Sequence, residues 1–350
     1  MKKNLPIVTG IRFLAAFYVF IFHIDLRLPL DFLPNIILDV INQGAVGVNV
    51  FFVLSGFILY YGYHSKKINI TEFILKRLAK IYPTYLVGLI IFLIVTLIMS
   101  IKTEYFFEVI MMNLLMVQSY LPHFAQSWYG GGSWSISTEF FFYFCFPFIL
   151  KFISDISKNK TLTLIVFFYF ISFTFGILTN FNILKFSFSY AFPPARISEF
   201  IIGVLTAHLV FKHKIKINIY FSIIIIIFIC ALLFYSKLRF LYGYVIQNII
   251  VIPLMIIILS NSIESKNNIL GFLGNKVFEY LGKVSYSFYI IQLPIMLFLE
   301  NENYLEKTNS LLYFSVALII NLVSAILLYE LIENPLHKIL GKKIKLAFSK

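Results

Sequence analysis

Apolar runs of about 20 residues recur along the whole chain, and short polar segments separate them. A run of this length is what an α-helix needs to cross the hydrocarbon core of a bilayer. The pattern predicts an all-α integral membrane protein with about ten transmembrane helices, near residues 7–27, 44–63, 81–100, 134–153, 162–180, 192–211, 218–236, 241–260, 284–299 and 311–332. The apolar stretch 105–120 is shorter and carries polar side chains, so we expect an interfacial or re-entrant helix there.

The composition supports this class of protein. Hydrophobic residues make up 60% of the chain, and the mean hydropathy of +0.89 lies above that of soluble globular proteins. The N-terminal segment has no small-residue cleavage site, so we expect it to stay as the first span rather than to be removed as a signal peptide. The two cysteines, Cys145 and Cys230, lie in apolar runs and predict neither a disulfide framework nor a metal site.

The basic residues predict an orientation. Of the 29 Lys and Arg residues, 21 fall in the two tails and in alternate loops, which the positive-inside rule assigns to the cytoplasm. Both termini are therefore predicted to be cytoplasmic, and the net charge of +13 requires no nucleic-acid partner. We expect residues 1–335 to form the transmembrane domain and residues 336–350 a basic cytoplasmic tail, with no appended soluble domain.

The first span carries two ionisable side chains, Arg12 and His23. At about 100° per helical residue their spacing returns to within roughly 20°, so both lie on one face, about 16 Å apart. Arginine binds phosphate or carboxylate, and histidine exchanges protons near neutral pH, so the pair suits transfer of an activated group across the bilayer. The alternative is an arginine that snorkels to the inner interface and a histidine bonded to a neighbouring helix.

A second basic group precedes the third span. Arg77 and Lys80 are three residues apart and therefore share a helix face at the predicted cytoplasmic surface. They predict a clamp for the phosphates of an anionic cytosolic donor, and the alternative is ordinary anchoring by positive charge. The second span contains small residues that allow close helix packing, namely Gly44, Gly47, Ser55 and Gly56.

The fourth span begins with Ser135 and Glu139 on one face, near the predicted outer end. A glutamate within the run TEFFFYFCF has no aqueous escape, so we expect it to face the protein interior and to serve as partner of a cation or as proton acceptor. In the sixth span, Arg196 either pairs with Glu199 or helps to line the same cavity.

The polar residues of the last two spans are attributed mostly to capping and anchoring; they are Ser285, Tyr286, Gln292, Glu330, Glu333 and His337. Glu333 and Pro335 predict that a helix ends at the inner surface.

Taken in order, seven segments resemble the acyltransferase-3 family of bacterial integral-membrane O-acyltransferases. They are Arg12 followed by His23, FFVLSGF at 51–57, RLAKIYP at 77–83, SWSISTE at 133–139, RISEFIIG at 196–203, LGKVSYSFYIIQLP at 281–294 and YELIENP at 329–335. Each motif alone is weak, but the seven in order cover nearly the whole chain.

The resemblance implies a ten-helix enzyme that takes an acyl group, usually acetyl, from cytosolic acyl-coenzyme A. It implies an acceptor hydroxyl on a cell-surface polysaccharide, lipopolysaccharide or peptidoglycan, and a location in the bacterial cytoplasmic membrane. Arg12 and His23 match residues regarded as essential, and the basic pair Arg77 and Lys80 matches one associated with the coenzyme. We expect no permanently bound cofactor; the partners are acyl-coenzyme A, the glycan and membrane lipids.

Two positions depart from the family pattern. Lys80 stands where members often have arginine, and it supplies charge without a bidentate fork. Gln292 stands where members often have histidine, and glutamine cannot act as a base near neutral pH. Proton chemistry is therefore assigned to His23.

The resulting hypothesis is an O-acyltransferase in which Arg77 and Lys80, with Arg12, hold the donor. His23 is either the general base on the acceptor hydroxyl or a transient acyl carrier, and Glu139 orients it or balances its charge. The acceptor side is assigned to Ser135, Trp134 and Arg196. A flippase or transporter of a lipid-linked sugar or anion is the alternative from another class, and a succinyl donor is the alternative within the family. The sequence leaves the oligomeric state open.

Overall fold

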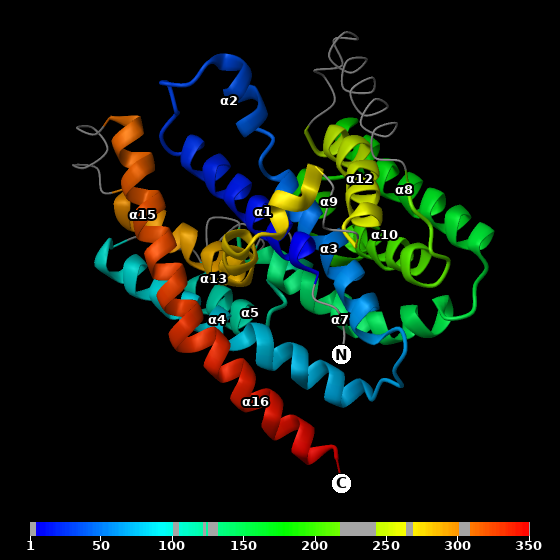
Figure 1. Cartoon of the computed structure of the whole chain (residues 1–350). Helices are drawn as coiled ribbons and strands as arrows, with labels where there is room; N and C mark the ends of the chain where they lie inside the picture. Colours follow the sequence, from blue (N-terminus) through cyan, green and yellow to red (C-terminus); the bar gives the residue numbers. More distant parts are fainter. Residues whose placement is uncertain are drawn as a thin grey trace.

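The computed structural model of the chain describes residues 5–100, 105–121, 124, 132–217, 243–263, 269–300 and 309–349. Within these residues every regular element is a helix (Figure 1), which confirms the predicted all-α class. Eight of the described helices are long and apolar enough to cross a membrane. They are α1 (Pro6–Asp25), α3 (Val46–Tyr63), α4 (Ile70–Ile98), α7 (Trp134–Ile153), α8 (Lys158–Asn180), α10 (Pro193–Phe211), α13 (Lys276–Leu299) and α15 (Ser310–Leu328), which runs on into α16.

Each of these helices overlaps a predicted span, although α4 and α13 begin before theirs. The predicted span 241–260 coincides with a further helix, α12 (Gly243–Asn261), and the predicted span 218–236 lies outside the described residues. The total of about ten spans and the cytoplasmic placement of both termini therefore remain predictions. We call the predicted cytoplasmic end of the bundle the inner end and the opposite end the outer end.

Short helices lie between the long ones. They are α2 (Asn35–Ile41), α5 (Phe106–Leu114), α9 (Phe186–Ala191) and the 3-10 turns η1 (Gln118–Tyr120) and η4 (Ile269–Gly274). In the stretch 105–120, the Tyr85 hydroxyl of α4 donates to the backbone oxygen of Asn113, 3.1 Å away, and Gln118 Nε2 donates to the backbone oxygen of Ser133, 2.8 Å away. The Asn113 and Gln118 side chains thus face the protein interior, whereas Glu108 in the same stretch is exposed.

Helix α4 begins well before the predicted third span. The Asn69 side chain caps its N-terminus by accepting a hydrogen bond from the backbone N–H of Glu72, 3.1 Å away. Arg77 and Lys80 therefore lie inside a long helix rather than in a segment before it, and Pro83 within α4 does not end it.

The predicted helix end at Glu333 and Pro335 is wrong. α15 continues through η5 (Tyr329–Glu333), a π turn, into α16 (Asn334–Ala347). Pro335 falls in the first turn of α16, where its missing N–H costs no helical hydrogen bond, and a π turn accommodates an extra residue without breaking the helix. The residues expected to form a basic tail are therefore helical to Ala347, and α16 packs along α4 (Figure 1).

Helix α10 lies at the centre of the bundle, with most of its residues buried against α3, α8, α7 and α12. Its closest approach is to α3, where two glycines face the partner backbone. A Cβ added to Gly203 would lie 2.0 Å from the backbone oxygen of Val53, and one added to Gly56 would lie 2.1 Å from that of Phe200. Gly56, one of the small residues predicted to allow close packing, therefore serves that purpose, as small residues do between membrane helices.

We expect Gly203→Ala to lower the thermal unfolding midpoint of the purified protein, because the new methyl group must push α3 away from α10. Overpacking of this kind costs about 1–3 kcal/mol or more where the obstacle is backbone. Gly62→Ala, also in α3, is the matched control, because no atom lies within 4 Å of its added Cβ. An unchanged midpoint for Gly203→Ala would contradict the close crossing.

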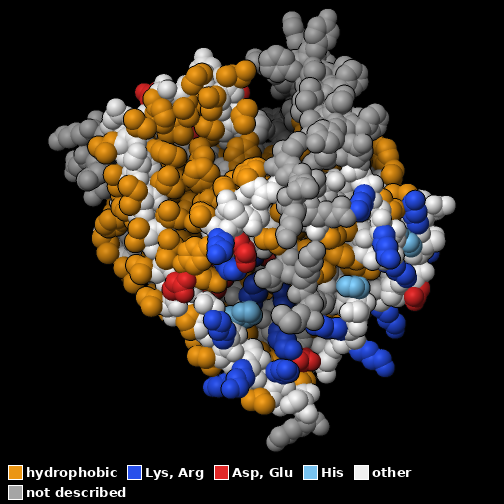
Figure 2. Space-filling view, in the orientation of Figure 1, with side chains coloured by type: hydrophobic (Ala, Val, Ile, Leu, Met, Phe, Trp, Pro, Cys, Tyr) orange, Lys and Arg blue, Asp and Glu red, His pale blue; other side chains and the backbone are white. Residues whose placement is uncertain are grey.

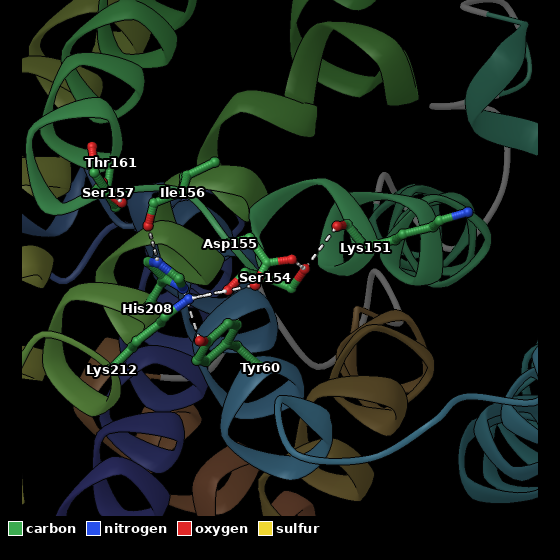
Figure 3. Close-up of polar contacts among 9 residues, drawn as sticks. All are labelled: Tyr60, Lys151, Ser154, Asp155, Ile156, Ser157, Thr161, His208 and Lys212. Atoms are coloured by element: carbon green, nitrogen blue, oxygen red, sulfur yellow. Dashed lines mark hydrogen bonds and ion pairs between the residues drawn. The ribbon is translucent and has the colours of Figure 1, made fainter.

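A polar cluster fixes the inner end of α10 to its neighbours (Figure 3). The Tyr60 hydroxyl of α3 lies 2.8 Å from His208 Nδ1, and His208 Nε2 lies 3.3 Å from the backbone oxygen of Ile156. Lys212 also donates to the backbone oxygen of Ser154. The cluster joins α3 and α10 to the turn between α7 and α8, so histidine serves here as a structural link.

Charge is segregated over the surface. Figure 2 shows hydrophobic side chains over the α2 and α15 side of this face, and Lys and Arg side chains over its lower part and along its right-hand edge. Exposed apolar side chains such as Leu312, Ile319 and Val323 continue along α15, as expected for a helix that faces lipid.

Candidate active site

A small cavity of about 80 Å³ lies between α1, α3, α4, α7 and α13. Three cations and one carboxylate line it: Arg12, Arg77, Lys80 and Glu139. Hydroxyl groups line it as well, from Ser55, Ser135, Tyr143, Ser285, Tyr286 and Tyr289. The fold thus brings together five of the predicted site residues, and we call this space the cationic cavity.

The three cations have no carboxylate partner within ion-pair distance in the described part of the chain. Arg77 is held by aromatic rings, since its guanidinium carbon lies 5.7 Å from the ring centre of Tyr63 and 5.6 Å from that of Phe73. Its Nη2 donates to the Tyr63 hydroxyl, 3.3 Å away, whereas its buried Nε has no partner among the described residues. A group of cations left in this state favours binding of an anion.

Glu139 lies on the cavity wall but does not contact His23. Its Oε1 accepts hydrogen bonds from the Ser55 hydroxyl, 2.8 Å away, and from the Tyr143 hydroxyl, 2.7 Å away. No hydrogen bond or ion pair between described residues joins it to His23. Glu139 faces α3 across the cavity, and the sequence pattern, which predicted that it faces inward, could not specify which helix it would meet. The expectation that Glu139 orients His23 is therefore corrected.

Ser135 closes the outer end of the cavity together with Tyr289. The two hydroxyl oxygens are 2.8 Å apart, and each group donates to the backbone oxygen of Gly132, 3.0 Å away in both cases. This places Ser135 on the predicted acceptor side of the cationic cavity.

Trp134 and Arg196 lie outside the cavity wall. Arg196 is fully buried; its Nε donates to Glu199 Oε1 and its Nη1 to the backbone oxygen of Tyr190, at 3.0 and 2.9 Å. Its guanidinium carbon lies 5.2–5.7 Å from the ring centres of Phe52, Trp134 and Tyr190. Of the two predicted roles for Arg196, the pairing with Glu199 is confirmed. Trp134 and Arg196 contact each other outside the cavity, so their placement assigns them to holding α10 against its neighbours.

His23 lies near the outer end of α1, half-buried and outside the cavity lining. The Gln292 side chain of α13 lies beside it. Arg27 donates from Nη1 to the backbone oxygen of His23, 3.1 Å away, and forms an ion pair with Glu300, the residue that follows α13. The outer end of α1 is therefore fixed to α13 on either side of the imidazole.

Glu333 is a site residue that sequence reasoning assigned to a helix end. Its Oε2 accepts a hydrogen bond from the Ser287 hydroxyl, 2.6 Å away, and its carboxylate is near enough to Lys80 and Arg12 to interact with them electrostatically. It is 7% exposed and belongs to the π turn, an element that is frequent at functional sites. In the sequence, the available signal for this site residue was a glutamate at the end of a long apolar run, two residues before a proline.

The described residues contain no group of three His, Cys, Asp or Glu side chains placed to hold a metal ion. Charged groups and hydroxyl groups share the wall of the cationic cavity, and Ser135 and Tyr289 lie at its outer end.

Comparison with known proteins shows which family the chain resembles. A family model of the acyltransferase-3 type, described as an acyltransferase domain, matches residues 6–330. The acyltransferase MdmB of Streptomyces mycarofaciens is 33% identical over 165 residues, which cover 45% of this chain and 42% of that protein. The O-acetyltransferase OatA of Staphylococcus aureus is 23% identical over 364 aligned positions, which cover 96% of this chain and 58% of that protein.

The chain thus spans less than two thirds of the length of the curated relatives that it matches. No solved structure matches it significantly.

Proposed function

Because the chain belongs to the acyltransferase-3 family, and is therefore an acyltransferase, we propose that it transfers an acyl group from cytosolic acyl-coenzyme A to a sugar hydroxyl. Acetyl is the proposed acyl group, and the acceptor is a cell-surface glycan or a lipid-linked sugar. The similarity to OatA, an O-acetyltransferase, supports acetyl transfer to oxygen. The proposed location is the bacterial cytoplasmic membrane, in keeping with the many apolar helices.

The observation that carries this proposal is the group of three cations, Arg12, Arg77 and Lys80, in one cavity. Coenzyme A carries phosphate groups, and arginine binds phosphate through two parallel N–H donors. Arg77 is held by two aromatic rings, which reduces the entropy that it would lose on binding. Lys80 adds a point charge from the next turn of the same helix.

We assign the proton transfer to His23. As a general base it would take the proton of the acceptor hydroxyl while the hydroxyl oxygen bonds to the acyl carbon and the carbon–sulfur bond of the thioester breaks. The thiolate leaves with the coenzyme and receives that proton. If His23 is instead a transient acyl carrier, the imidazole first displaces the thiolate and the acceptor oxygen then displaces the imidazole.

Incubating the purified protein with radiolabelled acetyl-coenzyme A and surface glycan tests the proposal. The expected result is release of free coenzyme together with label on the glycan that mild alkali removes, as it removes an ester. Parallel reactions with succinyl-coenzyme A identify the donor. Failure of every acyl-coenzyme A to release thiol in the presence of glycan would overturn the proposed donor class.

A further inference from the structure

One buried amide outside the cationic cavity has no hydrogen bond among the described residues. Gln292 on α13 is 0% exposed, yet neither its Oε1 nor its Nε2 has a partner in the described ranges. Roughly 90% or more of buried polar groups in proteins are paired, because an unpaired one lowers stability. Packing alone therefore does not explain why a glutamine is buried at this position without a hydrogen bond.

The packing of α1 on α13 places His23 beside this amide. One turn earlier in each helix, the rings of Phe20 and Phe288 pack with their centres 5.3 Å apart. The same register brings the Gln292 side chain beside the imidazole. His23 Nδ1 is itself buried and without a hydrogen-bond partner in the described part of the chain. Two groups that can bond each other therefore lie side by side.

A second buried glutamine shows what a structural amide looks like in this fold. Gln118 is also 0% exposed, but its Nε2 donates to the backbone oxygen of Ser133 and to the Tyr85 hydroxyl, at 2.8 and 3.2 Å. It ties η1 to α4 and α7. Gln292 makes no such link between described residues, so its amide is available to His23.

We propose that Gln292 is a positioning residue for His23. Its Oε1 accepts the Nδ1–H of the imidazole, which leaves Nε2 unprotonated and able to take the proton of the acceptor hydroxyl. The inference rests on the proposed role of His23 in acyl transfer. Gln292 changes no bond in the reaction; it fixes the tautomer and the orientation of the ring, as hydrogen-bond partners of functional histidines do.

The test is Gln292→Met, which keeps the length of the side chain and removes its hydrogen-bonding atoms. We expect kcat to fall about 10–100-fold, the usual effect of removing a partner that orients a histidine. The KM for acyl-coenzyme A stays unchanged, because the three cations lie in a separate cavity. The unfolding midpoint should fall by less than it does in Gln118→Met, because Gln292→Met removes one proposed bond to a side chain, whereas Gln118→Met removes two hydrogen bonds. Gln292→Glu, which keeps an acceptor oxygen, restores most of kcat.

Gln118→Met is the matched control, and it should lower the unfolding midpoint while the remaining folded protein keeps its kcat. The double variant His23→Ala, Gln292→Met should be no less active than His23→Ala alone, because a positioning residue has no effect once its partner is gone.

Three results would overturn the inference. The first is a wild-type kcat for Gln292→Met. The second is a loss of stability in Gln292→Met as large as that in Gln118→Met. The third is a double variant whose activity is lower than that of His23→Ala by the full factor that Gln292→Met alone causes. Full activity of His23→Ala would instead overturn the proposed role of His23, so the two failures are distinguishable.

Discussion

His23→Ala is expected to abolish acyl transfer while the protein is still produced and inserted in the membrane. General acid–base catalysis contributes roughly 10²–10⁴-fold, and the loss is larger if the imidazole carries the acyl group. The measurement is label transfer from acyl-coenzyme A to glycan by equal amounts of purified variant and wild-type protein. Apart from the proposed bond to Gln292, His23 Nδ1 has no partner among the described residues, so we expect the unfolding midpoint to change little.

The control is His64→Ala. His64 is an exposed histidine at the end of α3, where it stacks on Tyr60, and it lies outside the cationic cavity. It should keep full activity. Transfer by His23→Ala at the wild-type rate would remove His23 from the mechanism and would direct attention to the hydroxyl and carboxylate groups of the cavity.

The second large effect is expected at the cations. Arg77→Gln and Arg12→Gln should each raise the KM for acyl-coenzyme A, because each removes a charge-assisted hydrogen bond to the donor worth about 1.5–3 kcal/mol. That energy corresponds to roughly 10–100-fold in affinity. The measurement is the dependence of the initial rate on donor concentration at saturating acceptor. Arg77→Lys should restore little of the donor affinity that Arg77→Gln loses. Lysine lacks the planar guanidinium group that lies over Tyr63 and Phe73.

Lys76→Gln is the matched control for Arg77→Gln. Lys76 is the preceding residue of α4 and carries the same charge, but it forms an ion pair with Glu72 and lies outside the cavity lining. Its neutralisation should leave the donor KM unchanged. Equal increases of KM for Lys76→Gln and Arg77→Gln would indicate a general effect of surface charge rather than a donor site.

The order and type of the long helices could be predicted because each apolar run is long enough to span a bilayer and little else has that pattern. Helical spacing also predicted that Arg77 and Lys80 share a face, and both line one cavity. The start of α4 was missed because a cap at Asn69 and continued helical bonding outweigh the change from polar to apolar residues. The apolar pattern shows where a helix enters the lipid, but the helix itself can begin several residues before that point.

The contacts of inward-facing polar groups could not be predicted. Glu139 was expected to face inward, and it does, but its partners are Ser55 and Tyr143 rather than His23. Which neighbour a buried side chain meets depends on how the helices are arranged around one another, and a single sequence does not contain that arrangement. The π turn at Glu333 is likewise a tertiary feature, because its cost is offset only by the packing around it.

The unbroken run from α15 into α16 has a mechanical consequence. The 14 residues of α16 extend about 21 Å, at roughly 1.5 Å per residue. This helix is joined to α15 by the π turn that carries Glu333. A pull or a twist applied to the far end of α16, by a fused domain, an affinity tag or a surface support, is transmitted to a carboxylate near Lys80 and Arg12. Immobilising the protein through the end of α16 should therefore disturb donor binding more than immobilising it through the N-terminus.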